Sequence, residues 1–155
     1  SLDEGAKSDN EALNPLLDRS RTLIQNAKQK NAWFTPDSIK TAYSAWAKSL
    51  KKEAIENWLG PYPLEKAGRA KKVGVIMAGN IPLVGMHDAL TVLISGHHLL
   101  AKLSSKDEDL MALVLEVLAV IDPDWGNRIN RVEQLKEADL LIATGNDNSA
   151  RYFEY

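Results

Sequence analysis

The sequence contains no cysteine among its 155 residues. This excludes disulfides, thiolate metal sites and thiol nucleophiles within these residues. No apolar run is long enough to span a bilayer, and the chain opens with polar residues instead of a signal peptide. The 19 basic and 21 acidic residues give a net charge of -2, without the basic surplus that is usual in nucleic-acid-binding proteins. We therefore expect a cytoplasmic protein with no membrane insertion and no nucleic-acid partner.

The chain changes character near residue 70. Residues 1–70 carry apolar side chains at helical spacing among charged ones, which predicts an N-terminal helical segment without strands. Apolar positions from 13 to 27 predict a first helix, Thr35 and Pro36 suit the cap and first turn of a second, and a short third helix follows. The aromatic residues here are expected to pack in a core or between domains; they include Trp33, Phe34, Tyr43, Trp46 and Trp58.

From Lys71 onward, short apolar runs alternate with helical patterns. The apolar runs predict strands at 73–77, 98–103, 129–132 and 138–143. A helix is predicted at about 83–95, where Gly96 would provide the C-cap. A second helix is predicted to open at residues 104–108, to be strongly apolar over 110–120 and to stop before Asp122-Pro123. Apolar strands separated by helices are typical of parallel sheets. The fold class that we predict is therefore α/β, with a Rossmann-like parallel sheet preceded by an α-helical segment.

Three strand ends carry residues that suit ligand binding, because ligands of open parallel sheets bind at the carboxyl ends of strands. Asn80 follows the first strand, Lys102 ends the second, and Thr144-Gly145-Asn146 follows the last. Each also has a structural interpretation. Asn80 is a good helix cap, Lys102 can extend its ammonium group into solvent, and the last segment can be a plain turn.

Together and in this order, the three segments resemble the aldehyde dehydrogenase superfamily. Ala78-Gly79-Asn80-Ile81-Pro82 matches its Pro-Trp-Asn-x-Pro motif, Lys102-Leu103-Ser104-Ser105 its Lys-Pro-Ser-Glu motif, and Ala143-Thr144-Gly145-Asn146 its Phe-Thr-Gly-Ser motif. The amino-acid sequences of these segments, and of Arg151-Tyr-Phe-Glu-Tyr155, resemble those of the LuxC family of acyl-CoA reductases. The motif-bearing part covers about residues 73–155.

The resemblance implies NAD(P)H-dependent reduction of a fatty acyl-CoA thioester to an aldehyde, through a cysteine acyl-enzyme. Asn80 would donate its amide to the oxyanion, Lys102 would bind the adenosine ribose with Ser104 and Ser105 beside it, and Thr144, Gly145 and Asn146 would lie along the pyrophosphate. Residues 71–155 would then be the first part of the NAD(P)-binding domain. The aromatic end of the chain favours truncation before the catalytic domain, which would hold the cysteine.

Two departures from the family pattern affect the cofactor. Asn146 replaces the usual serine of the last motif, and Ser105 replaces the glutamate that binds the ribose 2′-hydroxyl in relatives that prefer NAD. A glutamate would repel a 2′-phosphate, whereas Ser105 next to Lys106 would accept one. We therefore expect NADPH, with NAD as the alternative.

Other interpretations stay open at this point. The enzymatic alternative is another member of the superfamily, such as a semialdehyde or glutamyl-phosphate reductase, because the substrate-binding residues that would decide this lie outside these residues. A non-catalytic nucleotide-binding module is a rival from another class. Association into a homo-oligomer is compatible with the sequence. His87, His97 and His98 have no spacing typical of a metal site, so no metal is expected.

Overall fold

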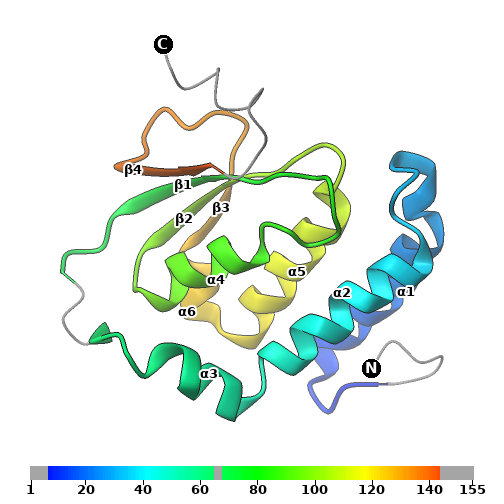
Figure 1. Cartoon of the computed structure of the whole chain (residues 1–155), viewed down its shortest axis with the longest axis horizontal. Coiled ribbons are helices and arrows are strands. Elements are labelled where there is room, and N and C mark those ends of the chain that lie inside the picture. The colour runs from blue at the N-terminus through cyan, green and yellow to red at the C-terminus, as the bar shows by residue number, and fades with distance from the viewer. Residues whose placement is uncertain (1–6, 65–67, 144–155) are drawn as a thin grey trace. The chain divides into compact units, whose positions relative to one another are not determined.

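The computed structural model describes residues 7–64 and 68–143. Residues 1–69 and residues 70–155 form two compact units, and each is described by itself. The fold class is α/β, as the sequence predicts. Helices build the described part of the first unit, and a parallel sheet with helices builds the second (Figure 1).

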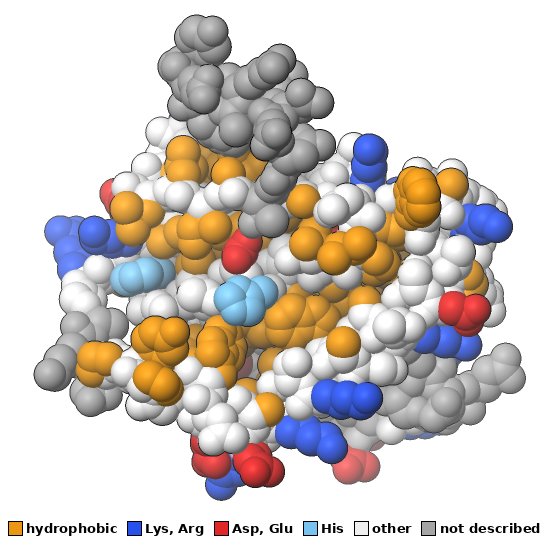
Figure 2. Space-filling model, viewed as in Figure 1, with side chains coloured by type: hydrophobic (Ala, Val, Ile, Leu, Met, Phe, Trp, Pro, Cys, Tyr) orange, Lys and Arg blue, Asp and Glu red, His pale blue; other side chains and the backbone are white. Residues whose placement is uncertain are grey.

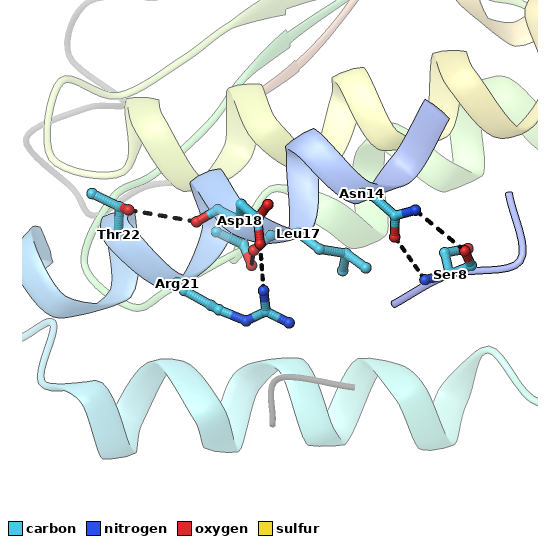
Figure 3. Close-up of polar contacts among 7 residues, drawn as sticks. Ser8, Asn14, Leu17, Asp18, Arg21 and Thr22 are labelled. Atoms are coloured by element: carbon cyan, nitrogen blue, oxygen red, sulfur yellow. Dashed lines mark hydrogen bonds and ion pairs between the residues drawn. The ribbon is translucent and has the colours of Figure 1, made fainter. Parts of the chain in front are cut away.

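The described part of the first unit consists of a short 3-10 helix, η1, and three α-helices. They span Glu11–Leu13 (η1), Asn14–Lys30 (α1), Pro36–Ser49 (α2) and Lys52–Leu59 (α3). Polar side chains fix the chain where it enters α1. The Asn14 Oδ1 atom accepts a hydrogen bond from the Ser8 amide at 2.8 Å, and Asp18 pairs with Arg21 one turn further along the helix (Figure 3). The contact between Ser8 and Asn14 holds the preceding segment against the first turn of α1, whereas the pair of Asp18 and Arg21 lies within the helix.

The predicted start of α2 is confirmed. Thr35 has an extended backbone, and its Oγ1 atom accepts a hydrogen bond from the Ser38 amide at 3.1 Å. Pro36 takes the first helical position, where its missing N–H leaves no helical hydrogen bond unmade. The Thr35 side chain therefore satisfies one of the free amides at the start of the helix.

The turn before α2 separates the two aromatic residues that were expected to be buried. The Phe34 side chain is 2% exposed, as expected for a core residue, whereas Trp33 is 81% exposed and does not pack in the core of its unit. Asn31 organises this turn, since its Oδ1 atom accepts from the Trp33 amide and its carbonyl accepts from the Phe34 amide. Consecutive side chains of such a turn point in different directions, and burying Phe34 turns Trp33 outward.

The second unit is built on a parallel sheet with the strand order β3-β2-β1-β4. Its strands are Lys72–Ile76 (β1), His98–Lys102 (β2), Ile129–Arg131 (β3) and Leu140–Ala143 (β4). β1 pairs with β2 on one side and with β4 on the other. The chain thus adds β2 and β3 on one side of β1 and then returns to place β4 on the opposite side. The strand order reverses next to β1.

In the described part of the second unit, three helices accompany these strands and lie along one side of the sheet (Figure 1). They are α4 (Met86–Ile94), α5 (Glu108–Ile121) and α6 (Pro123–Gly126). The first half of α5 is buried continuously from Leu110 to Leu115, as expected for a helix that is apolar all round. Val75, Leu99 and Ala101 in the two central strands are 0% exposed. The core of this unit therefore includes the middle of β1 and β2.

The connection from β3 to β4 crosses the sheet at Gly74. A side chain at Gly74 would place its Cβ 2.7 Å from a methyl group of Leu141 and 2.9 Å from one of Leu135, so glycine allows both leucines to approach β1. The residues just before β4 are held at the start of β1. There the Lys72 amide donates to Asp139 at 2.8 Å, and the Lys72 ammonium pairs with Glu137. These contacts set the register of β4.

β4 itself remains open to solvent within the described structure. Leu140 and Leu141 are 47% and 54% exposed, and hydrophobic side chains reach the surface over this end of the sheet (Figure 2). Side chains of adjacent strand residues point to opposite faces, so both faces of β4 are exposed. The burial of the sheet is therefore strongest at β1 and β2.

The boundaries of several elements differ from the predicted ones. α4 begins at Met86 instead of about residue 83, because residues 82–85 form turns. α6 was not predicted, since one helical turn after Asp122-Pro123 is too short to show a periodic pattern. The end of α4 is as predicted. Gly96 has a φ of +78°, and its amide donates to the Leu93 carbonyl at 3.1 Å.

Candidate functional site

The candidate site lies at the carboxyl edge of the sheet. Because β1 and β2 are parallel neighbours, with Ile76 opposite Lys102, the segments that follow them leave the same edge. The pairing extends one residue further, as the Met77 amide donates to the Lys102 carbonyl at 3.0 Å. The strand order reverses between β1 and β4, and such a reversal is where open α/β sheets bind ligands.

Asn80 lies in the loop of residues 77–85, called here the Asn80 loop. Its side chain is exposed, and the helix that follows starts only at Met86, with Gly85 in the cap position. Asn80 is therefore not the cap of α4, which was the structural interpretation of this residue. The exposed position leaves its amide accessible from the carboxyl edge of the sheet.

The Asn80 loop packs closely on the segment after β2. A Cβ added to Gly79 would lie 2.3 Å from Ser104 Oγ and 2.9 Å from Lys106 Cβ, closer than real contacts allow. The same loop contains Leu83 with a φ of +60°. This left-handed conformation costs a residue other than glycine about 1–2 kcal/mol, and Leu83 is nevertheless buried. The loop thus has a defined, strained conformation.

The residues predicted on β2 have different environments. Lys102 is exposed at the end of the strand, so its ammonium group reaches solvent, and its backbone holds Met77. Ser104 is half-buried under Gly79, and its hydroxyl accepts a hydrogen bond from the Lys106 amide at 3.3 Å. Ser104 therefore already has a structural role in the turn that leads to α5.

Ser105 lies in a pocket between the ends of β2 and β3. The pocket has a volume of about 410 Å³ and contains both signs of charge, with lining residues Ala101, Leu103, Ser105, Glu108, Arg131, Val132 and Glu133. This volume is within the usual range for small-molecule sites. Arg131 and Glu133 were missed in the sequence, because their approach to Ser105 depends on the pairing of β2 with β3.

Asp107 is a second group that the sequence did not single out. It is 3% exposed, and its Oδ2 atom accepts a hydrogen bond from the Leu83 amide at 2.8 Å. Burial raises the pKa of the Asp107 carboxyl to about 7, and the hydrogen bond from Leu83 opposes that rise. An aspartate just before a helix has the ordinary interpretation of an N-cap, so only the contact with Leu83 reveals it.

The remaining predicted positions add little to the site. Thr144, Gly145 and Asn146 lie outside the described residues. Among the residues that are described, no group of three or more histidine, aspartate and glutamate side chains is arranged to hold a metal ion. A hollow of about 440 Å³ in the first unit is lined by α2 alone, and one helix face cannot enclose a ligand. No helix within residues 7–64 and 68–143 is long and apolar enough to cross a membrane.

Comparison with family models, with curated proteins and with solved structures finds no match.

Proposed function

We propose that this chain is the cofactor-binding part of an NADPH-dependent acyl-CoA reductase that converts a fatty acyl thioester to an aldehyde. The supporting observation is that the Asn80 loop and the segment from Lys102 to Ser105 leave adjacent strands at the same edge of the sheet. Gly79 and Ser104, one from each segment, are in close approach. Two motifs that resemble the LuxC family are thus neighbours in space as well as in sequence order.

The proposed reaction consumes a thioester, NADPH and a proton, and it yields an aldehyde, free CoA and NADP⁺. The sequence contains no cysteine, so the proposal assigns the attacking thiolate to a residue outside residues 1–155. Asn80 would donate its side-chain amide to the oxyanion that forms when the thiolate attacks the carbonyl carbon. Donors of this kind contribute about 10²–10³ in rate. When bound, the cofactor would supply the hydride.

The residues present fit the adenosine end of such a cofactor. Lys102 offers an exposed ammonium group at the edge of the sheet, where it would donate to the ribose hydroxyls. The pocket at Ser105 is large enough for a ribose and is lined by Arg131. The Arg131 guanidinium pairs with Glu116 at 3.9 Å, and it would exchange that partner for a 2′-phosphate. Glu108 and Glu133 line the same pocket, and their carboxylates would favour an unmodified 2′-hydroxyl. NADH is therefore the alternative cofactor.

A cytoplasmic location belongs to this proposal, because it is there that such reductases meet their cofactor and acyl-CoA. A semialdehyde or glutamyl-phosphate reductase would use the same cofactor edge, so the described residues do not separate these substrates. A non-catalytic nucleotide-binding module would also bind cofactor here. In such a module Asn80 would have no catalytic role.

Cofactor titration tests the proposal. NADPH and NADH are titrated separately into the full chain, into Lys102→Ala and into the control Lys71→Ala, which removes an exposed lysine next to the opposite end of β1. Loss of a hydrogen bond to a charged group costs about 1.5–3 kcal/mol, so we expect Lys102→Ala to bind NADPH about 10- to 100-fold more weakly. The control should bind as the parent chain does.

Two results would overturn the proposal. One is the absence of saturable binding of either cofactor by the parent chain. The other is equal weakening by the Lys102 and Lys71 substitutions, which would show that the lysines act only through net charge. Tighter binding of NADH than of NADPH would replace the proposed cofactor and keep the proposed site.

A further inference from the structure

The Asp107 carboxylate connects two segments that are far apart in sequence. Asp107 has the N-cap position of α5, yet its side chain makes no capping hydrogen bond to that helix. Its Oδ2 atom instead accepts the Leu83 amide, 24 residues earlier in the chain, at 2.8 Å. An aspartate in this position would normally bond to an amide of its own helix. The contact with Leu83 is therefore a specific alternative use of the side chain.

Leu83 needs such a partner. Its φ of +60° is one that leucine rarely adopts, and its side chain is only 2% exposed. A strained residue persists where its surroundings over-determine its conformation. Here the surroundings include the Asp107 carboxylate, and Gly79 and Gly85 are packed so closely that added Cβ atoms would clash with Ser104 and Met77. The Asn80 loop is thus held on both sides of Asn80.

We propose that Asp107 is a positioning residue, which holds the Asn80 loop through the Leu83 amide and so fixes where Asn80 lies at the carboxyl edge of the sheet. Asn80 is three residues before Leu83, with Pro82 between them, so few backbone torsions separate the fixed point from the side chain. The significance of Asn80 for catalysis rests on the function proposed above. The contact between Asp107 and the loop does not.

The same contact makes the loop sensitive to the ionisation of Asp107. Burial raises the pKa of this carboxyl to about 7, and its Oδ1 atom has no hydrogen-bond partner among the described residues. An ionised acceptor makes a shorter and stronger hydrogen bond than a neutral one. The bond to Leu83 should therefore tighten as Asp107 loses its proton. The ionisable side chains on the elements that meet here are Lys102, Lys106, Glu108 and Asp109 on the Asp107 side, and His87 and Asp88 at the start of α4.

NMR spectroscopy of the full chain tests the inference without any ligand. We expect the Leu83 backbone amide and the Asn80 side-chain amide to shift with pH, with one common midpoint near the pKa of Asp107. Asp107→Asn keeps an oxygen acceptor but cannot ionise, so it should abolish both titrations and keep Leu83 protected from hydrogen exchange. Asp107→Ala should speed exchange at Leu83 about 5- to 150-fold, as expected when a buried amide loses its partner. Amides of β2 should keep their exchange rates.

Glu108→Gln is the matched control, because it removes a neighbouring exposed carboxylate. It should leave both titrations in place. The inference is overturned if the Leu83 amide titrates and the Asn80 amide does not, or if Asp107→Asn leaves the titration of Asn80 unchanged. Should Asp107→Ala fail to fold, the parent chain and Asp107→Asn still decide the matter. Failure of NADPH to bind would count against the proposed function and not against this contact, since these spectra contain no cofactor.

Discussion

Replacing Asp107 by asparagine should change how the stability of the sheet unit depends on pH. Burial raises the pKa of this carboxyl from 3.8 to about 7 in the folded chain. Because the folded-state pKa lies above the unfolded value, the folded state holds its proton more tightly. The stabilising contribution of this proton is complete below the unfolded pKa and is lost as pH rises through the folded pKa. Asp107→Asn has no such loss, and it can still accept the Leu83 amide.

The size of the effect follows from the shift in pKa. One pKa unit corresponds to about 1.4 kcal/mol, so the shift of about 3 units limits the loss to roughly 4 kcal/mol. This loss develops as pH rises from the unfolded pKa to the folded pKa. A scan from about pH 5 to pH 8 covers only the part of this range between about pH 5 and pH 7. We therefore expect the parent chain to lose about 2–3 kcal/mol of unfolding free energy relative to Asp107→Asn over this scan.

Urea unfolding measures this difference. The transition should be followed by the amide signals of β1 and β2, because these strands belong to residues 70–155 and do not report on the helical first unit. Glu108→Gln is the control, with an expected difference from the parent chain of less than about 0.5 kcal/mol at either pH. Parallel losses of stability in the parent chain and in Asp107→Asn would refute the reasoning, since they would mean that ionising this carboxyl costs nothing in the folded state.

Substitutions at three other positions test the packing and the helix cap described above. Gly79→Ala should destabilise the sheet unit by about 1–3 kcal/mol, because its Cβ would overlap a serine held in a turn. Gly74→Ala should cost less than about 1 kcal/mol, because the flexible ends of the leucine side chains can move. Urea unfolding of the two variants side by side checks this order. Equal losses would contradict it. Thr35→Ala should cost the helical unit about 1 kcal/mol through the lost cap of α2, as seen by circular dichroism during thermal unfolding, and Thr35→Ser should retain most of that stability.

The two central strands and the long helices could be predicted from the sequence because each has a strong local pattern, whereas β3 has only a weak one. The apolar run at 73–77 is bounded by polar and turn residues, and α5 is apolar from Leu110 onward. The start of α4 was predicted too early, since Pro82 suits a first helical turn. The strain at Leu83 depends on its burial and on the Asp107 carboxylate, and neither is visible in a local window.

The site was predictable only in part, for a related reason. The position of Asn80 and Lys102 at one edge follows from the parallel pairing of β1 and β2, which the alternation of strands and helices already suggests. The approach of Arg131 to Ser105 requires the pairing of β2 with β3 across 26 residues of sequence, with Ala101 opposite Arg131. Nothing in the local sequence at Arg131 indicates that register.

The segment from Lys102 to Glu108 connects the two halves of the candidate site. Ser104 and Asp107 contact the Asn80 loop, whereas Ser105 and Glu108 line the pocket between β2 and β3. Seven consecutive residues thus serve both places, and the turn at Ser104 restrains them, with hydrogen bonds from the Lys106 and Asp107 amides. A ligand that fills the pocket would therefore contact the same short segment whose Ser104 and Asp107 contact the Asn80 loop.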